Sequence, residues 1–388
     1  MLSTVKNLFG EFMNAMIKKL LQGQAVEWRA LGEVLVRTKG IKITAGKMKE
    51  LHKSNAPIKI FAGGKTFALV DFDDIPQKDI NHKPSIIVKS RGIIEFEYYD
   101  KPFSHKNEMW AYHSQNPNIN IKFIYYFLKQ NEPYFQKIGS KMQMPQIATP
   151  DTDKFKIPIP PLSVQAKIVQ ILDTFTELND QLTTELGMRQ KQYQYYRDLL
   201  LSEHELAKVG FEWKTLGKLG IINRGKRVVK SQLTTEGVYP VYQNSLQPLG
   251  YFDKSNVKAN TTFMITAGAA GEIGYSNCAF WSADDCYYFD CPKDVLDDRF
   301  LYHSLKKQQN KIFSQVRKAS IPRLGRNSVE NIKIPIPPLS VQSQIVAILD
   351  TFDTLTQSIS EGLPKEIQLR QKQYEYYRER LLNFKATI

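Results

Sequence analysis

The sequence predicts an α+β protein in which two globular mixed α/β domains are joined by two long antiparallel coiled-coil helices, arranged as a pseudo-two-fold internal repeat. Three observations lead to this expectation. One segment occurs twice, each copy carries apolar residues at heptad spacing, and the regions between the copies differ from each other. A chain of 388 residues is long enough for two or three separate cores.

The duplicated segment reads KIPIPPLSVQAKIVQILDTF at residues 156–175 and KIPIPPLSVQSQIVAILDTF at residues 333–352. Seventeen of these twenty positions are identical, at an offset of 177 residues. The match resumes at RQKQYQYYRDLL (189–200) and RQKQYEYYRERL (370–381), where the offset is 181, so the second copy holds four additional residues. Since four residues are close to one helical turn, we expect an extra turn that preserves the apolar seam.

Each copy begins with Pro-Ile-Pro-Pro, at residues 158–161 and 335–338, which disfavours helix and keeps the chain extended. Ser163 and Ser340 follow as candidate N-caps of long helices. Apolar residues then recur at steps of four and three, the spacing of paired coiled-coil helices. They are Val164, Ile168, Ile171, Phe175, Leu178 and Leu182 in the first copy and Val341, Ile345, Ile348, Phe352, Leu355 and Ile359 in the second.

The first copy predicts a helix of roughly 38 residues, about 55 Å long. In the second copy Gly362 and Pro364 are expected to kink or interrupt the helix. Because each helix carries a single apolar seam, the two most simply bury these seams against each other. The alternative is that both are core helices of ordinary compact domains.

Shorter matches flank the variable regions. VEW at residues 26–28 is echoed by FEW at 211–213, and KFIYYFLK at 122–129 by RFLYHSLK at 299–306. An amphipathic helix is expected at residues 3–21, in the place that the end of the first helical segment occupies in the second half. The order of segments is therefore cyclic, which favours a pseudo-two-fold molecule.

These boundaries predict five parts. They are a helix at residues 1–25, a variable region at 26–155, a helical region at 156–207, a second variable region at 208–332 and a second helical region at 333–388.

The formal net charge is +14, from 53 Lys and Arg against 39 Asp and Glu. Such an excess indicates either a polyanionic partner or simply a basic protein. No apolar run is long enough to span a membrane, and the start lacks a signal-peptide core, so we expect a cytoplasmic protein. Cys278, Cys286 and Cys291 match neither a zinc pattern nor a disulfide framework, and no metal site or cofactor is expected.

The duplicated Ile-Pro-Ile-Pro-Pro-Leu run, the Gln that follows it, the apolar helix seam and the basic tail resemble the specificity subunits of Type I restriction-modification enzymes. YPVYQNSLQPLGYFD (239–253) and TAGAAGEIGYSNCAFW (266–281) in the second variable region look like the strands and turns of that family's recognition domains. The first variable region departs from this pattern, with only AGGKTF (62–67) and SIIVKSRGIIEFEYYD (85–100) in comparable places.

The resemblance implies that the variable regions are target-recognition domains, each reading one half of a split, asymmetric target in double-stranded DNA. It further implies that the paired helices fix the spacer between the halves. Methyltransferase subunits bring S-adenosylmethionine, ATP-dependent restriction subunits join them, and the chain itself is a non-catalytic recognition subunit without a cofactor.

Candidate DNA contacts are cations for phosphates and forked donors for base edges, gathered near glycine or proline within the variable regions. In the first region they are Lys39, Lys42, Lys47, Lys89, Arg91, Lys141, Gln143 and Gln146. In the second they are Arg224, Lys226, Arg227, Lys230, Arg317, Lys318, Arg323 and Arg326. The alternative for each of these residues is that it is an ordinary solvated residue at the surface.

Three motifs are rejected as catalytic or metal-binding features. AGGKTF lacks the first glycine of a phosphate-binding loop, since Lys59 stands there. AGAAGEIG (267–274) fits a tight connection between strands, and the acidic residues at 71–74 fit a solvated turn. Two other functions stay open: a self-contained DNA-modifying enzyme, which requires a cofactor motif, and a coiled-coil scaffold or RNA-binding protein, which predicts no preference for duplex DNA.

Overall fold

The computed structural model describes residues 26–140, 143–357 and 361–384. The helix expected at residues 3–21 lies outside these ranges. The chain divides into two compact units. Unit 1 comprises Met1–Gln181 and Gln368–Ile388, and unit 2 comprises Leu182–Ile367.

Unit 1 contains a four-stranded antiparallel sheet in the order β2-β8-β5-β6 and a three-stranded sheet in the order β4-β3-β7. In the smaller sheet β3 is antiparallel to β4 and parallel to β7. The strands are β2 (Val36–Arg37), β3 (Ile58–Phe61), β4 (Phe67–Val70), β5 (Ser85–Lys89), β6 (Glu95–Tyr99), β7 (Phe103–His105) and β8 (Trp110–His113). The helices are α2 (Leu31–Val34), α3 (Ala45–Leu51), α4 (Ile121–Gln130), α5 (Glu132–Gly139) and α6 (Thr149–Asp153).

Unit 2 repeats this topology strand for strand. Its sheets have the orders β11-β17-β14-β15 and β13-β12-β16, and β12 is again parallel to one neighbour and antiparallel to the other. The strands are β11 (Ile222–Arg224), β12 (Tyr239–Tyr242), β13 (Gly250–Phe252), β14 (Thr261–Ile265), β15 (Ile273–Ser276), β16 (Trp281–Ser282) and β17 (Cys286–Phe289). The helices are α8 (Glu203–Ala207), α9 (Leu216–Leu219), α10 (Asp298–Lys307), α11 (Gln309–Phe313) and α12 (Arg326–Glu330).

The shared topology confirms the predicted α+β repeat, although the two variable regions have little sequence in common. Strands β5 and β14 occupy the same place in their sheets, and all five residues of each are buried. Continuous burial requires an apolar run rather than an alternating one, as Ile86, Ile87 and Val88 provide in β5. Each unit therefore has a fully buried central strand, β5 or β14, and loops from other parts of the unit form hydrogen bonds just beyond its end.

The chain at the start of each proline run is extended, as expected, and lies in a strand. β9 (Lys156–Ile159) pairs with β1 (Glu27–Ala30), and β18 (Lys333–Ile336) pairs with β10 (Glu212–Thr215). Both sheets have two antiparallel strands, in which proline is tolerated because one side of each strand makes no ladder bond. This pairing closes each variable region at the point where its long helix begins.

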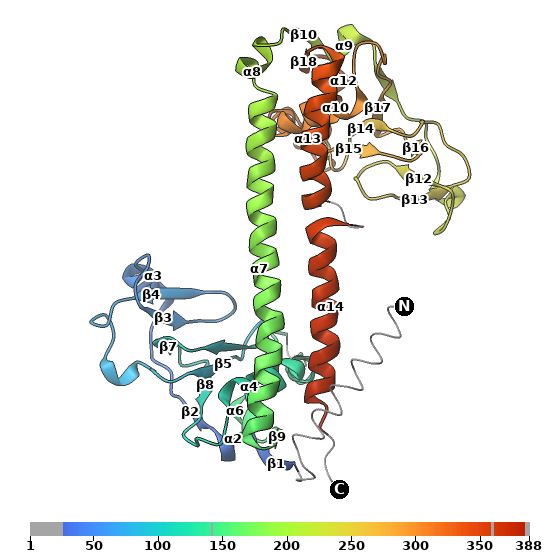
Figure 1. Ribbon diagram of the computed structural model, residues 1–388. Helices are drawn as coiled ribbons and strands as arrows, with labels where there is room; N and C mark the ends of the chain where they lie inside the picture. Colours follow the sequence, from blue (N-terminus) through green and yellow to red (C-terminus); the bar gives the residue numbers. More distant parts are fainter. Residues whose placement is uncertain (1–25, 141–142, 358–360, 385–388) are drawn as a thin grey trace. The chain divides into compact units, whose positions relative to one another are not determined.

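The first long helix is α7 (Leu162–Leu200), a single helix of 39 residues that passes from unit 1 into unit 2 (Figure 1). The second copy forms two helices, α13 (Leu339–Gln357) with 19 residues and α14 (Gly362–Leu382) with 21. The expectation of an extra helical turn is therefore wrong. Gly362 has a φ of +77°, a backbone conformation that breaks the helix where the four additional residues fall.

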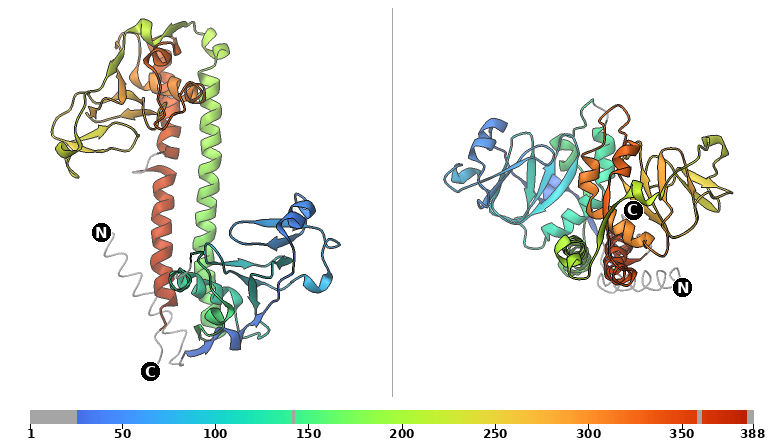
Figure 2. Two further views of the ribbon diagram at one scale, coloured as in Figure 1. Left: turned by 180° about the vertical axis from the view of Figure 1, so that it is seen from behind. Right: turned by 90° about the horizontal axis from the view of Figure 1, so that it is seen from above.

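The predicted antiparallel pairing of the helices is found within each unit. In unit 1 the end of α14 runs beside the start of α7, and Phe175 stacks on Tyr377 at 5.2 Å (Figures 1 and 2). In unit 2 the end of α7 packs on α13, where Tyr196 stacks on Phe352 at 5.4 Å. Ile348 was predicted wrongly as a seam residue, because it is 44% exposed while the neighbouring Leu349 is buried, and Ile359 lies outside the described residues. These helices bury a second side against their own variable region, so the buried face departs from a strict heptad.

Candidate nucleic-acid interface

In unit 2 a short basic hairpin is joined to the end of the central strand β14. Arg317 and Arg323 exchange backbone hydrogen bonds of 2.9 and 3.2 Å, which brings the two predicted cations together. On its other side Arg323 pairs with Ala267, the second residue after β14. The N–H of Leu324 donates to Thr266 at 2.8 Å, and that of Gly268 donates to Pro322 at 3.1 Å.

The other predicted basic cluster of unit 2, at residues 224–230, reaches the same loop as the hairpin does. The Arg224 guanidinium donates to the carbonyl of Asp284 at 3.2 Å, and the Lys226 N–H donates to Ser282 at 2.9 Å. Arg323 lies 3.7 Å from the carboxylate of Asp285. The loop at 282–285 therefore brings two sequence-distant basic segments into one surface, whereas Arg227 and Lys230 lie exposed further along their segment.

The two motifs of the second variable region that resembled recognition-domain elements adjoin this surface. AGAAGEIG connects β14 to β15, an antiparallel pair, as expected for a tight connection. Ala269 in that connection donates its N–H to Asn244 at 2.9 Å, and Asn244 lies in the loop after β12. Gly268 has a φ of +82° and packs against Asn244, so a side chain at this position is excluded.

Unit 1 builds the corresponding surface from different residues. Arg91, just after β5, pairs with Gln146, and the N–H of Ile147 donates to Ser90 at 3.0 Å. Lys39 and Lys42 lie exposed on a segment that the N–H of Ile41 ties to His105 at 2.8 Å. Gln143 is exposed, and Lys141 lies outside the described residues.

The surroundings of Lys89 argue against its predicted DNA contact. Its side chain is buried in β5, and the ammonium lies 2.5 Å from Glu95 and 2.9 Å from Glu97. These two carboxylates raise its pKa against the opposing effect of burial, so the charge is already neutralised inside the fold. A phosphate would have to displace both partners, and Lys89 is therefore a structural residue in our account.

Two other predicted cations already have acidic partners at the surface. Lys47 forms an ion pair with Glu50 at 2.7 Å, and Arg326 with Glu330 at 2.7 Å. Exposed pairs of this kind are weak and exchange readily with other anions, so both residues remain available to a phosphate. Lys318 is exposed next to Arg317.

The residues that hold each variable region on its long helix include a buried glutamine whose role sequence reasoning missed. Gln342 is fully buried; its amide donates to Val295 at 2.9 Å and Pro337 at 2.8 Å, and it accepts the N–H of Asp297 at 2.9 Å. Gln165 makes the same three kinds of bond in unit 1. The signal was its place in the duplicated segment, four residues after the last proline of the run.

A polar network adds a second attachment in unit 2. Arg299 on α10 donates to Asp350 at 2.7 Å and to Asp353 at 2.6 Å on α13. His303 lies 2.7 Å from Asp350, and its other ring nitrogen lies 3.1 Å from the hydroxyl of Tyr193. In unit 1, Lys122 and Tyr126 on α4 contact Asp173 on α7 in the same arrangement.

His303 is expected to make unit 2 sensitive to mild acid. Burial lowers the pKa of His303 more than the contact with Asp350 raises it. The neutral ring therefore donates from Nε2 to Asp350 and accepts the Tyr193 hydroxyl at Nδ1. Below the unfolded-state pKa of about 6.5, the unfolded chain binds a proton that the folded unit does not. The stability contributed by neutral His303 is thus present above that pH and lost as the pH falls.

The variant His303→Gln keeps a donor for Asp350 but does not titrate. Urea unfolding of wild type and variant should show a stability difference that is smaller at pH 5.5 than at pH 7.5. A difference that grows in acid would mean that His303 is protonated against Asp350, contrary to this assignment.

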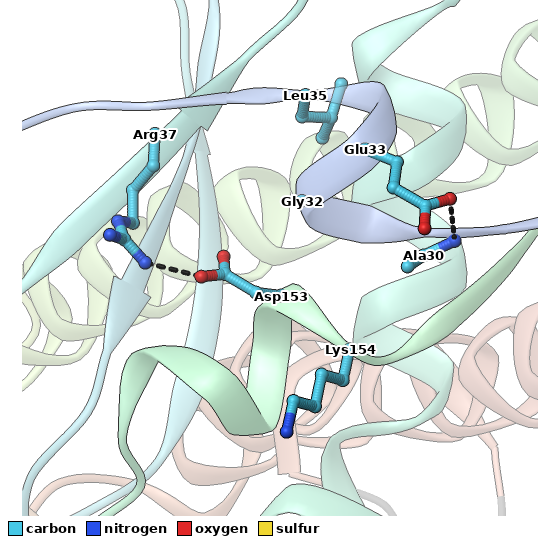
Figure 3. A pocket seen from close by; sticks show the side chains of 7 residues that line it. All are labelled: Ala30, Gly32, Glu33, Leu35, Arg37, Asp153 and Lys154. Carbon is cyan, nitrogen blue, oxygen red and sulfur yellow. Dashed lines mark hydrogen bonds and ion pairs between the residues drawn. The ribbon is translucent and has the colours of Figure 1, made fainter.

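Unit 1 has an open pocket of about 390 Å³. In its lining, Arg37 pairs with Asp153 at 2.5 Å, and Glu33 accepts the backbone N–H of Ala30 at 3.3 Å (Figure 3). The pocket lies where Gly32 of α2 packs against α6, and Gly217 packs against α12 in the same way. It is therefore a by-product of the repeated packing rather than a catalytic arrangement.

Within residues 26–140, 143–357 and 361–384, no helix is both long and apolar enough to cross a membrane. In the same part of the chain, no group of three His, Cys, Asp or Glu side chains is placed to hold a metal ion. Burial raises the pKa of the Cys286 thiol to about 12, so this cysteine is not a reactive thiolate at neutral pH.

A family model described as the Type I restriction modification DNA specificity domain matches residues 26–187 and again 208–369. The chain is 32% identical over 398 residues to the Type I restriction enzyme EcoR124I/EcoR124II specificity subunit of Escherichia coli, covering 95% of this chain and 96% of that protein. It is 31% identical over 401 residues to a putative type I restriction enzyme specificity subunit of Haemophilus influenzae, covering 95% and 98%.

Two solved structures share the fold. The S subunit of a Type I restriction-modification system from M. genitalium has a TM-score of 0.70 and 20% identity, covering 94% of this chain and 98% of that one. A chain from a study of complex assembly and conformational transition of the type I R-M system has a TM-score of 0.51 and 15% identity, covering 93% and 98%.

Proposed function

Since the chain belongs to the family of Type I restriction-modification specificity subunits, we propose that its two variable regions are target-recognition domains that each read one half of a split, asymmetric DNA target. We assign them to residues 26–155 and 208–332. The helical regions at 156–207 and 333–388 join them, and a helix at 1–25 completes the cyclic repeat.

One observation carries this proposal: the same platform is built twice, with different side chains on its loops. The sheets, the two-stranded closures and the buried glutamines are equivalent in both units. The loops at the ends of β5 and β14 instead carry different donors and cations. A duplicated scaffold with unlike loops suits a protein that reads two unlike sequences, and the net charge of +14 suits a phosphate backbone.

The long helices act as the spacer ruler in this proposal. At 39 residues, α7 is about 58 Å long, which exceeds the roughly 34 Å of one turn of B-DNA. Its unbroken course supports the assignment, because a helix transmits both a fixed rise and a fixed rotation along its axis.

The chain contributes recognition rather than catalysis, and it works in the cytoplasm together with methyltransferase and ATP-dependent restriction subunits. The relatives' designation as specificity subunits supports this division of labour, as does the complex assembly named for one solved relative. S-adenosylmethionine is brought by the methyltransferase partner, and the chain itself needs no cofactor.

Methyl transfer to genomic DNA tests the division directly. The purified chain alone, and its partner methyltransferase alone, should transfer no labelled methyl groups to the target, whereas the mixture should transfer them at one motif. Transfer by the chain alone would make it a self-contained enzyme and overturn the proposal.

A further inference from the structure

Gln146 in unit 1 and Arg323 in unit 2 occupy the same backbone position. The N–H that follows each residue donates to the first residue after the central strand: Ile147 to Ser90 at 3.0 Å and Leu324 to Thr266 at 2.8 Å. The carbonyl before each residue accepts a glycine N–H, Pro145 from Gly92 at 2.9 Å and Pro322 from Gly268 at 3.1 Å. The equivalence therefore rests on hydrogen bonding and not on sequence similarity alone.

This position is held more rigidly than the other candidate contacts. Each residue pairs with the chain just beyond a central strand, Gln146 with Arg91 and Arg323 with Ala267. Those strands, β5 and β14, are buried along their whole length. Base readout needs donors held in a fixed geometry, whereas phosphate contacts tolerate flexible side chains. A backbone tied to the sheet favours base readout at this position.

The side chain of Arg323 is placed to donate outward. It is 63% exposed, and its guanidinium lies 3.7 Å from Asp285, beyond hydrogen-bond distance. Other cations of the same surface are engaged more closely, since Arg224 donates to a backbone carbonyl at 3.2 Å and Arg326 pairs with Glu330 at 2.7 Å. Among these three, Arg323 has the fork most available for a ligand.

A second shared feature marks the segments that carry Gln146 and Arg323 as contact elements. Two residues before each donor, an aliphatic side chain is exposed: Met144 is 64% exposed and Ile321 is 54% exposed. Each precedes a proline, and neither contributes to a core cluster. An exposed apolar side chain beside a forked donor is a combination that suits a base edge, where apolar contact with the thymine methyl is available.

We propose that this shared position determines one base in each half of the target, with Arg323 selecting guanine and Gln146 selecting adenine. The guanidinium fork matches the two acceptors of guanine in the major groove, and the glutamine amide matches the acceptor and donor of adenine. The inference rests on the proposed function, because it assigns particular bases to the two recognition domains.

Methylome sequencing of cells that carry the partner subunits and single variants tests the assignment. Arg323→Gln should replace a guanine by an adenine at one position of one half-site, with a change in preference of about 10- to 100-fold. Gln146→Arg should make the opposite replacement in the other half-site. Arg323→Lys keeps the charge but loses the rigid fork, so it should weaken the preference for guanine at that one position only. This variant decides the outcome if Arg323→Gln abolishes methylation.

The matched control is Lys318→Gln, which removes one charge from the same hairpin. It should leave every base of the motif unchanged, weaken methylation about uniformly at all sites and make DNA binding less dependent on salt. If Arg323→Gln only weakens methylation in the same uniform way, Arg323 is a phosphate contact and the inference is wrong. A different result would contradict the proposed function: the wild-type chain would direct methylation to no motif at all.

Discussion

A complex whose α7 has been lengthened by two residues between Gln181 and Leu182 is expected to lose methylation, whereas one lengthened by four residues should methylate a target with a longer spacer. Each residue rotates the helix by about 100° and adds about 1.5 Å. Two residues therefore turn unit 2 by about 200° relative to its natural orientation. A recognition surface turned away in this manner cannot meet its half-site.

Four residues add about 6 Å and a rotation of about 40° beyond one full turn. One base pair of B-DNA advances about 3.4 Å and turns by roughly 34°. The lengthened complex should thus accept roughly one to two more base pairs of spacer with both half-sites unchanged. The insertion lies at the boundary between the units, away from the contacts of Phe175 with Tyr377 and of Tyr196 with Phe352.

Methylome sequencing of both insertion strains measures this, with co-purification of the methyltransferase as the control for folding. An unchanged spacer after the four-residue insertion, or altered half-site bases, would show that α7 is not the ruler. The break between α13 and α14 makes this a cleaner test than deleting residues near Gly362, because the chain there is not a continuous helix.

Replacing residues 208–332 by a second copy of residues 26–155 should convert the target into an inverted repeat of a single half-site. In the pseudo-two-fold arrangement that the repeated sequence predicts, two identical readers read a palindromic sequence. The inserted region can make equivalent contacts with the helical region that follows it. β1 replaces β10 beside the same proline run, and Lys122 takes the place of Arg299 opposite Asp350. We therefore expect the hybrid to fold and to direct methylation.

The reciprocal hybrid, with residues 208–332 in both places, should methylate the inverted repeat of the other half-site. The two new motifs together should account for both halves of the natural one. If either hybrid retained the complete natural motif, the recognition regions would not be independent readers of separate halves.

Three features could be predicted because they lie in segments that occur twice in the sequence. They are the duplication itself, the extended chain at the proline runs and the long helices. The equivalence of the variable regions could not be predicted. Their short strands depend on burial and pairing with neighbours, and these are compatible with many sequences. Gly362 and Pro364 did signal a break in the second helix, but spacing alone suggested that the additional residues would form another turn.

The sequence predicted clusters of candidate DNA-contacting residues, but it could not predict which individual residues are available for contact. Lys89 looks like its basic neighbours in the sequence, yet the pairing of β5 with β6 places Glu95 directly opposite it. The pairing of Gln146 with Arg91, and of Arg323 with Ala267, depends on bridges across many residues of chain. No local pattern specifies such bridges, so the fixed position of these two donors emerges only from the fold.

The most direct test of the account is methylome sequencing of a strain that expresses the partner subunits, with and without this gene. We expect methylation at one split, non-palindromic motif to disappear when the gene is removed and to return on complementation. Retention of every methylated motif in the strain without the gene would contradict the assignment of this chain as the subunit that selects the target.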